Sequence, residues 1–105
     1  MLTINPDKKV QTIILTYDVT PGSFEKLLEI LTEAYRSLLS KQPGFVAAAV
    51  HVNDAKTRIA SYSQWESRDA FQAMQRLEEV QAVNHQLSDL SKGFFPVMYE
   101  VAAAF

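Results

Sequence analysis

Along the chain the spacing of apolar residues switches between the period of a strand and the period of a helix. The order of these switches restricts the fold more than any other feature. Period-two or continuous apolar runs, rich in β-branched and aromatic residues, predict four strands, at residues 10–18, 45–53, 57–65 and 94–102. Apolar residues three and four apart predict helices between the first two and between the last two of these strands. The sequence therefore predicts an α+β, ferredoxin-like split β-α-β fold, with a four-stranded antiparallel sheet and its helices on one face.

The ends of the helices are also marked in the sequence. From Ser23 to Lys41 the apolar and charged side chains separate onto two faces, and Pro43 ends this helix because it disfavours helical geometry in the residue before it. Ser67 is placed to cap a helix that carries Phe71. A further apolar stripe follows, and Gly93 ends the helical segment before the last strand.

Composition bounds the number of domains and the kinds of partner. A chain of 105 residues suffices for one hydrophobic core, so we expect a single domain over residues 1–105, with its core at about 10–101. The ten Lys and Arg residues form no basic run, which argues against nucleic acid as a partner. Cysteine is absent, which excludes thiolate and disulfide chemistry. Neither a signal peptide nor a membrane span is evident, so we expect a cytoplasmic protein with no membrane partner.

The predicted hairpin of residues 45–65 is apolar on both faces, although helices can cover only one of them. Val46, Val50 and Val52 alternate with Phe45 and Ala49 along its first strand. Contact with a second copy of the chain would remove the uncovered face from water, at about 25 cal/mol per Å² of apolar area. We therefore expect a homodimer.

Small side chains in this hairpin predict a pocket beneath the helices. If Asn53 pairs with Thr57, one face of the sheet carries small residues flanked by aromatic and histidine side chains: Phe45, Ala47, Ala49, His51, Ile59, Ser61, Ser63 and Trp65. A helix that rests on alanine and serine leaves space for an aromatic ligand. The alternative is that helix side chains fill this space, in which case Trp65 is only a core anchor and His51 a surface histidine.

The stretch "PGFVAAAVHVNDAKTRIASYSQWESRDAFQAM" (43–74) resembles the antibiotic biosynthesis monooxygenase family of dimeric α+β barrel proteins. It is similar to that family's run of Pro-Gly-Phe, a strand ending near a basic residue or His, a short hairpin, then Trp-Glu-Ser and a capped helix. The resemblance extends from the first predicted strand to about Val101. It implies the fold and a homodimer but leaves the chemistry open, because the family contains cofactor-free oxygenases, haem-degrading enzymes and members of no known activity.

Haem-degrading members of that family combine the tryptophan with an Asn on the first strand and an iron-ligating His ten residues after the tryptophan. Here these positions hold Leu15 and Gln75, neither of which can do the same work. We therefore do not expect haem degradation. A metal site is not expected either, because the two histidines have no nearby carboxylate at ligand spacing.

The chain resembles the quinone-forming, cofactor-free oxygenases of the family more closely, although two positions differ. Ser61 stands where those enzymes have an Asn that binds the substrate oxygen, and Phe71 stands where they have a Tyr. The resemblance implies a monooxygenase that uses dioxygen and no cofactor on a small phenolic or quinol-type aromatic molecule. The implied roles are a general base and oxygen-stabilising groups, His51, Ser61 and Trp65, and substrate contacts, Phe45, Ala47, Ala49, Ser63 and Phe71. The two departures leave a second hypothesis open, a non-catalytic dimeric module that binds a ligand or serves a structural role.

Overall fold

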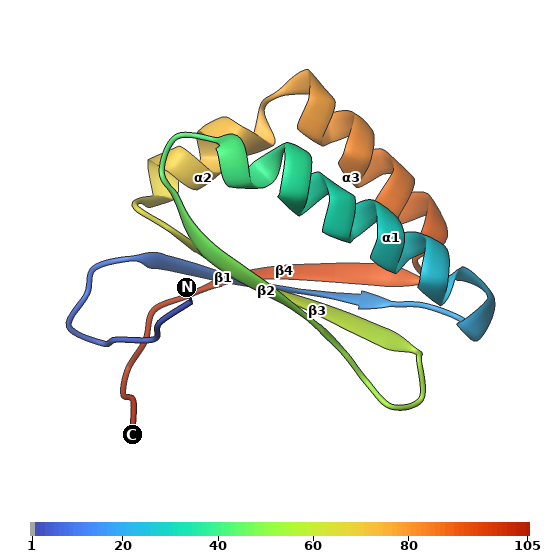
Figure 1. Ribbon diagram of the computed structural model, residues 1–105, viewed down its shortest axis with the longest axis horizontal. Coiled ribbons are helices and arrows are strands. Elements are labelled where there is room, and N and C mark those ends of the chain that lie inside the picture. The colour runs from blue at the N-terminus through green and yellow to red at the C-terminus, as the bar shows by residue number, and fades with distance from the viewer. Residues whose placement is uncertain (1) are drawn as a thin grey trace.

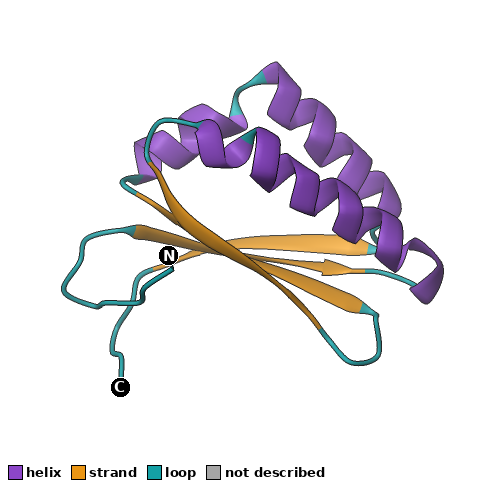
Figure 2. Cartoon of the chain, in the orientation of Figure 1, coloured by secondary structure: helices purple, strands orange, loops and turns teal. Residues whose placement is uncertain are grey.

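The computed structural model describes residues 2–105 and has two layers, a four-stranded antiparallel sheet and three helices that all lie on one of its faces (Figure 1, Figure 2). The strands lie in the order β2-β3-β1-β4, so the ferredoxin-like prediction is confirmed. The elements are β1 (Gln11–Asp18), α1 (Pro21–Ser37), the 3₁₀ helix η1 (Leu39–Lys41), β2 (Phe45–Val52), β3 (Arg58–Trp65), α2 (Arg68–Gln75), α3 (Glu78–Leu90) and β4 (Gly93–Tyr99).

The helix boundaries follow local chemistry. Pro21 occupies the first turn of α1, where a missing backbone N–H costs nothing. Ser67 caps α2 as predicted, because its Oγ accepts a hydrogen bond from the backbone N–H of Ala70 at 3.1 Å. The helical segment after Ser67 is divided, however, since α2 ends at Gln75 and α3 begins at Glu78. This break turns α3 back across the sheet beside α1 (Figure 1).

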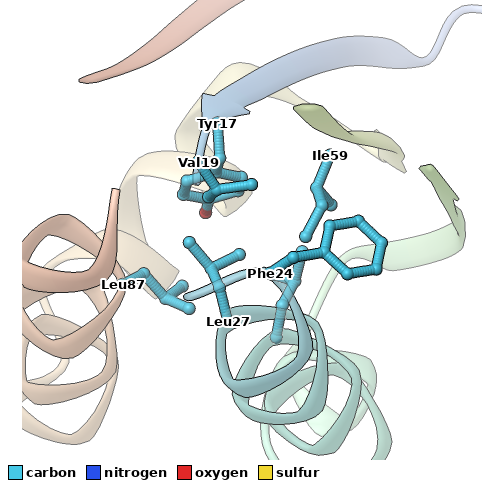
Figure 3. Packing of buried hydrophobic residues seen from close by; sticks show 7 residues of the cluster. Tyr17, Val19, Phe24, Leu27, Ile59 and Leu87 are labelled. Carbon is cyan, nitrogen blue, oxygen red and sulfur yellow. The ribbon is translucent and has the colours of Figure 1, made fainter. Parts of the chain in front are cut away.

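The buried apolar residues form two clusters between the sheet and the helices. Figure 3 shows the first, in which Leu27 of α1 points toward Tyr17 and Val19 and has Leu87 of α3 beside it. The second lies toward α2 and consists of Ile13, Trp65, Phe71, Met74 and Val80. Together they attach all three helices to one face of the sheet.

The hairpin between β2 and β3 has a different register from the predicted one. Asn53 pairs with Arg58 and not with Thr57, because the Asn53 side-chain oxygen accepts hydrogen bonds from the backbone N–H groups of both residues, at 2.9 and 3.0 Å. The loop is therefore one residue longer than predicted. At the other end of the hairpin Phe45 still lies opposite Trp65, and a β-bulge between Phe45 and Ala47 absorbs the difference.

This register change moves three predicted site residues to the other side of the sheet. His51 lies opposite Ala60 and Ala49 opposite Tyr62, and these partners alternate with the helix-facing residues of β3. Ala47, opposite Gln64, lies on the same outer face. The prediction that His51, Ala47 and Ala49 share a face with Ser61 and Ser63 is wrong, because a shift of one residue reverses the face of every side chain.

No helix covers the outer face of the sheet. Phe95, Val97 and Tyr99 of β4 project from it and are 56%, 45% and 46% exposed. The N-terminal segment covers a small part of this face, where the Gln64 side chain donates a hydrogen bond to the carbonyl of Thr3 at 2.8 Å. Within residues 2–105, none of the helices has the length and apolar character needed to cross a membrane.

Gly44, which leads into β2, lies against the first turn of α2. Its φ of 84° is in the left-handed region, and a Cβ added there would lie 2.4 Å from the Cβ of Ala70. Its carbonyl accepts a hydrogen bond from the backbone N–H of Glu66 at 2.7 Å. The glycine thus allows the start of β2 to approach the β3–α2 junction.

We expect Gly44→Ala to lower the free energy of unfolding by about 1–3 kcal/mol, because it combines an unfavourable backbone conformation with a steric overlap. The matched control is Gly22→Ala in the exposed first turn of α1, where a Cβ meets only the Thr20 hydroxyl at 3.8 Å. That change should leave stability equal or slightly higher. Urea denaturation of both variants measures the difference, and equal stabilities would contradict the expectation.

Candidate active site

A largely enclosed cavity of about 50 Å³ lies between the inner face of the sheet and the three helices. Most of its wall is aliphatic or aromatic. Side chains with hydrogen-bonding groups also line it: Tyr17, Tyr35, Ser61, Ser63, Trp65, Gln75 and Asn84. Of these, Gln75 and Asn84 are exposed to solvent, so they mark the mouth of the cavity between α2 and α3.

Half of the predicted site residues come together at this cavity. Ser61, Ser63, Trp65 and Phe71 all line it. Phe45 does not line it but packs behind it, with its ring edge-on to Trp65 at a centroid distance of 5.3 Å and an interplanar angle of 88°. The remaining three, His51, Ala47 and Ala49, lie on the outer face of the sheet, for the reason given above.

Trp65 is both a core anchor and a wall of the cavity. Only 1% of its surface is exposed, and its ring packs between Phe45 and Phe71, the latter at a centroid distance of 5.9 Å. The indole N–H donates a hydrogen bond to the Ser63 hydroxyl at 3.2 Å, which meets the requirement of a buried N–H for a partner. Neither of the two predicted interpretations of Trp65 therefore excludes the other.

Tyr35 is a cavity residue that the sequence analysis missed. It projects from α1 toward β3, and its hydroxyl forms a hydrogen bond with the hydroxyl of Ser61. In the sequence it appears only as one member of the apolar stripe of α1. One sequence signal pointed to it. Ser61 and Ser63 are two residues apart and so share one face of a buried strand, and buried hydroxyls there require a polar partner from the helix layer.

The electrostatic environment of the cavity favours neutral groups. Burial raises the pKa of Tyr17, and the nearby Tyr35 raises it further. Burial also raises the pKa of Tyr35, while hydrogen bonds from Ser61 and Ser63 oppose this change in part. Among residues 2–105, no Asp, Glu, His, Lys or Arg side chain lines the cavity. At neutral pH the cavity therefore offers hydroxyl, indole and amide groups but no charged base.

The two positions that argue against haem degradation also belong to this cavity. Leu15 lines it from β1 and Gln75 lines it from α2, so a ligand bound in the cavity would meet both side chains. Neither side chain is an iron ligand of the histidine type, and no histidine lines the cavity in the described part of the chain. Among the same residues, no group of three or more His, Asp or Glu side chains is arranged to hold a metal ion.

The fold and this cavity define a small ferredoxin-like α+β domain with a largely enclosed, mostly apolar site under its helices. The profile of the antibiotic biosynthesis monooxygenase family matches residues 11–86, which is more than half of the chain. The protein therefore belongs to the antibiotic biosynthesis monooxygenase family. None of the curated protein sequences compared with the chain matches it.

Solved structures with the same fold include oxygenases. A monooxygenase from the ActVA-Orf6 gene of Streptomyces coelicolor, in complex with nanaomycin D, is 25% identical, with a TM-score of 0.80 over 93% of this chain and 92% of that one. SnoaB, a cofactor-independent oxygenase from Streptomyces nogalater, is 20% identical, with a TM-score of 0.73 over 90% and 95%. A conserved protein from Methanosarcina mazei Go1 is 12% identical, with a TM-score of 0.80 over 90% and 95%.

The buried phenols lead to an expected loss of stability at high pH. Unfolding returns Tyr17 and Tyr35 to an ordinary pKa of about 10, so above this pH the unfolded chain loses protons before the native protein does. Their contribution should be fully present below pH 10 and should fall above it, by up to about 1.4 kcal/mol per pH unit for each phenol. Urea unfolding at pH 8 and pH 11 measures this fall. Tyr35→Phe should reduce it, and an unchanged fall in that variant would contradict the assignment.

Proposed function

We propose that this protein is a cofactor-independent monooxygenase that oxidises a small phenol or hydroquinone with dioxygen in the cavity beneath its helices. The observation that carries the proposal is an apolar, uncharged cavity in which hydroxyl groups gather beside Trp65. Family membership supports a monooxygenase, and the similarity to an enzyme in complex with nanaomycin D supports a small-molecule ligand.

The proposed reaction begins with loss of a proton from the substrate phenol. The resulting anion transfers one electron to dioxygen, and the two radicals combine at a ring carbon to give a peroxide. Loss of water then leaves a quinone, so one oxygen atom enters the product and the other leaves as water. In this scheme Trp65 and Phe71 hold the substrate ring, while Ser61 and Ser63 stabilise the oxygen that carries the charge.

The structure changes the expected source of the base. His51 lies on the outer face of the sheet, so it is not placed to remove a proton in this cavity. Ionising a phenol with a pKa of about 10 at pH 7 costs roughly 4 kcal/mol, and the cavity has no charged side chain to offset it. We infer that the proton passes to water, so that the rate depends on the ionisation of the substrate.

Oxygen uptake with hydroquinone between pH 6 and pH 9 tests this mechanism. The value of kcat/KM should rise by about tenfold per pH unit, without an inflection near the histidine pKa of about 6.5. His51→Ala should have the same profile as the unchanged protein. A profile that levels off near pH 6.5 and loses that feature in His51→Ala would refute the mechanism. No uptake above the rate in buffer, with hydroquinone and a panel of small phenols, would refute the oxygenase itself.

The small size of the cavity favours a second candidate, a binding module without turnover. An engineered apolar cavity of about 150 Å³ binds benzene, whereas this one measures about 50 Å³. A one-ring ligand would therefore have to displace part of the wall. Met74 is suited to such a change, because its unbranched side chain has three rotatable bonds. Saturable binding of hydroquinone without oxygen uptake would favour this second function.

We also propose that the protein forms a homodimer through the outer faces of two sheets. The support is the exposed apolar surface of Phe95, Val97 and Tyr99, which no helix covers. The same surface on a second copy of the chain would be complementary to it across a two-fold axis. Contact between two such faces would bury apolar area that a monomer leaves in water.

Light scattering at micromolar concentration should therefore give twice the chain mass of 11.8 kDa. Val97→Glu should shift the protein to monomer, because it would bury a carboxylate at the contact. Gln81→Glu on the exposed side of α3 adds the same charge elsewhere and should leave the dimer intact. A monomer mass for the unchanged protein would refute the proposal.

A further inference from the structure

We propose that Tyr35 is the residue that anchors the ligand, by donating a hydrogen bond from its hydroxyl to an oxygen atom of a neutral aromatic molecule. This inference rests on the cavity assigned under the proposed function, but it concerns binding and does not require turnover. It adds to that site a residue from α1, whereas the site residues predicted from the sequence all come from the β2–β3 hairpin and α2.

The position of Tyr35 depends on the small residues opposite it. Ser61 and Ser63 are both 3% exposed and lie on the same face of β3, below α1. Their short side chains leave room for the phenol ring of Tyr35 to reach the strand, where its hydroxyl bonds to that of Ser61. The Tyr35 ring is also held by Phe45, at a centroid distance of 6.4 Å. Its hydroxyl is thus fixed at the polar end of an otherwise apolar space.

The donors and acceptors around Tyr35 leave its proton available. The Trp65 indole can only donate, so Ser63 accepts from it and keeps its own O–H for another partner. The Tyr35 and Ser61 hydroxyls share one hydrogen bond, so one O–H group of this pair is not used in it. With Ser61 as the donor, the Tyr35 O–H is the group left to donate into the cavity that both residues line.

The ligand that fits this arrangement carries an oxygen but no charge. An O–H donor in the cavity favours a phenol, a hydroquinone or a quinone carbonyl over a plain hydrocarbon ring. A carboxylate or an ammonium group would be buried without an opposite charge, since no charged side chain lines the cavity in residues 2–105. Tyr35 is therefore proposed as the determinant of selectivity for neutral oxygenated aromatic ligands.

A comparison of phenol with toluene isolates the proposed hydrogen bond, because the two ligands have similar size and differ in the hydroxyl. Trp65 is the only tryptophan of the chain and lines the cavity, so its single indole N–H signal in a ¹⁵N NMR spectrum reports binding. Both ligands are titrated into the unchanged protein, into Tyr35→Phe, and into Tyr99→Phe as a matched control on the outer face of the sheet, away from the cavity. Urea denaturation shows that each variant is folded.

Tyr35→Phe should weaken phenol binding by about fivefold and leave toluene binding unchanged, whereas Tyr99→Phe should leave both unchanged. If Tyr35→Phe does not fold, Ser61→Ala replaces it and should also weaken phenol but not toluene. Equal weakening of both ligands would show a structural role only and would overturn the proposal, as would unchanged phenol binding or no indole shift with phenol. If Tyr35→Phe weakens phenol binding alone but the unchanged protein takes up no oxygen, the proposed monooxygenase is refuted and this inference stands.

Discussion

The register of the β2–β3 hairpin determines which side chains meet the helices, and two local contacts set it from opposite ends. At one end Gly44 lies against Ala70 of α2, and Phe45 pairs with Trp65. At the other end Asn53 closes the loop through its side chain and pairs with Arg58. These two alignments differ by one residue, and the bulge between Phe45 and Ala47 accommodates the difference.

The character of the cavity follows from the small side chains on the helix-facing side of β3. Because Ser61 and Ser63 face the helices, short side chains line the space under α1, and Tyr35 reaches into it to bond to the hydroxyl of Ser61. Trp65 closes one side and donates its indole N–H to the hydroxyl of Ser63. The result is a cavity with several hydrogen-bonding groups and no charge, which limits the chemistry to neutral ligands or to anions held by hydrogen bonds alone.

The prediction of which residues share a face of the sheet was right within β3 and wrong across the hairpin. Ser61, Ser63 and Trp65 lie in one strand, and strict alternation places them on one face whatever the neighbouring strand does. His51 belongs to β2, so the side of the sheet on which it lies depends on the length of the β2–β3 loop and on the bulge. Neither of these can be read from the sequence of one strand alone. Tyr35 was missed for a different reason, because helical spacing places it among apolar residues and does not show what its hydroxyl meets.

The sequence by itself determined the order of strands and helices, the cap at Ser67 and the family, because each of these depends on local periodicity or on a contiguous motif. Only the tertiary structure decided the register of β2 and the pairing of Tyr35 with Ser61. These features arise where segments distant in sequence come together, and a one-residue shift at such a contact reverses a face without changing any local pattern.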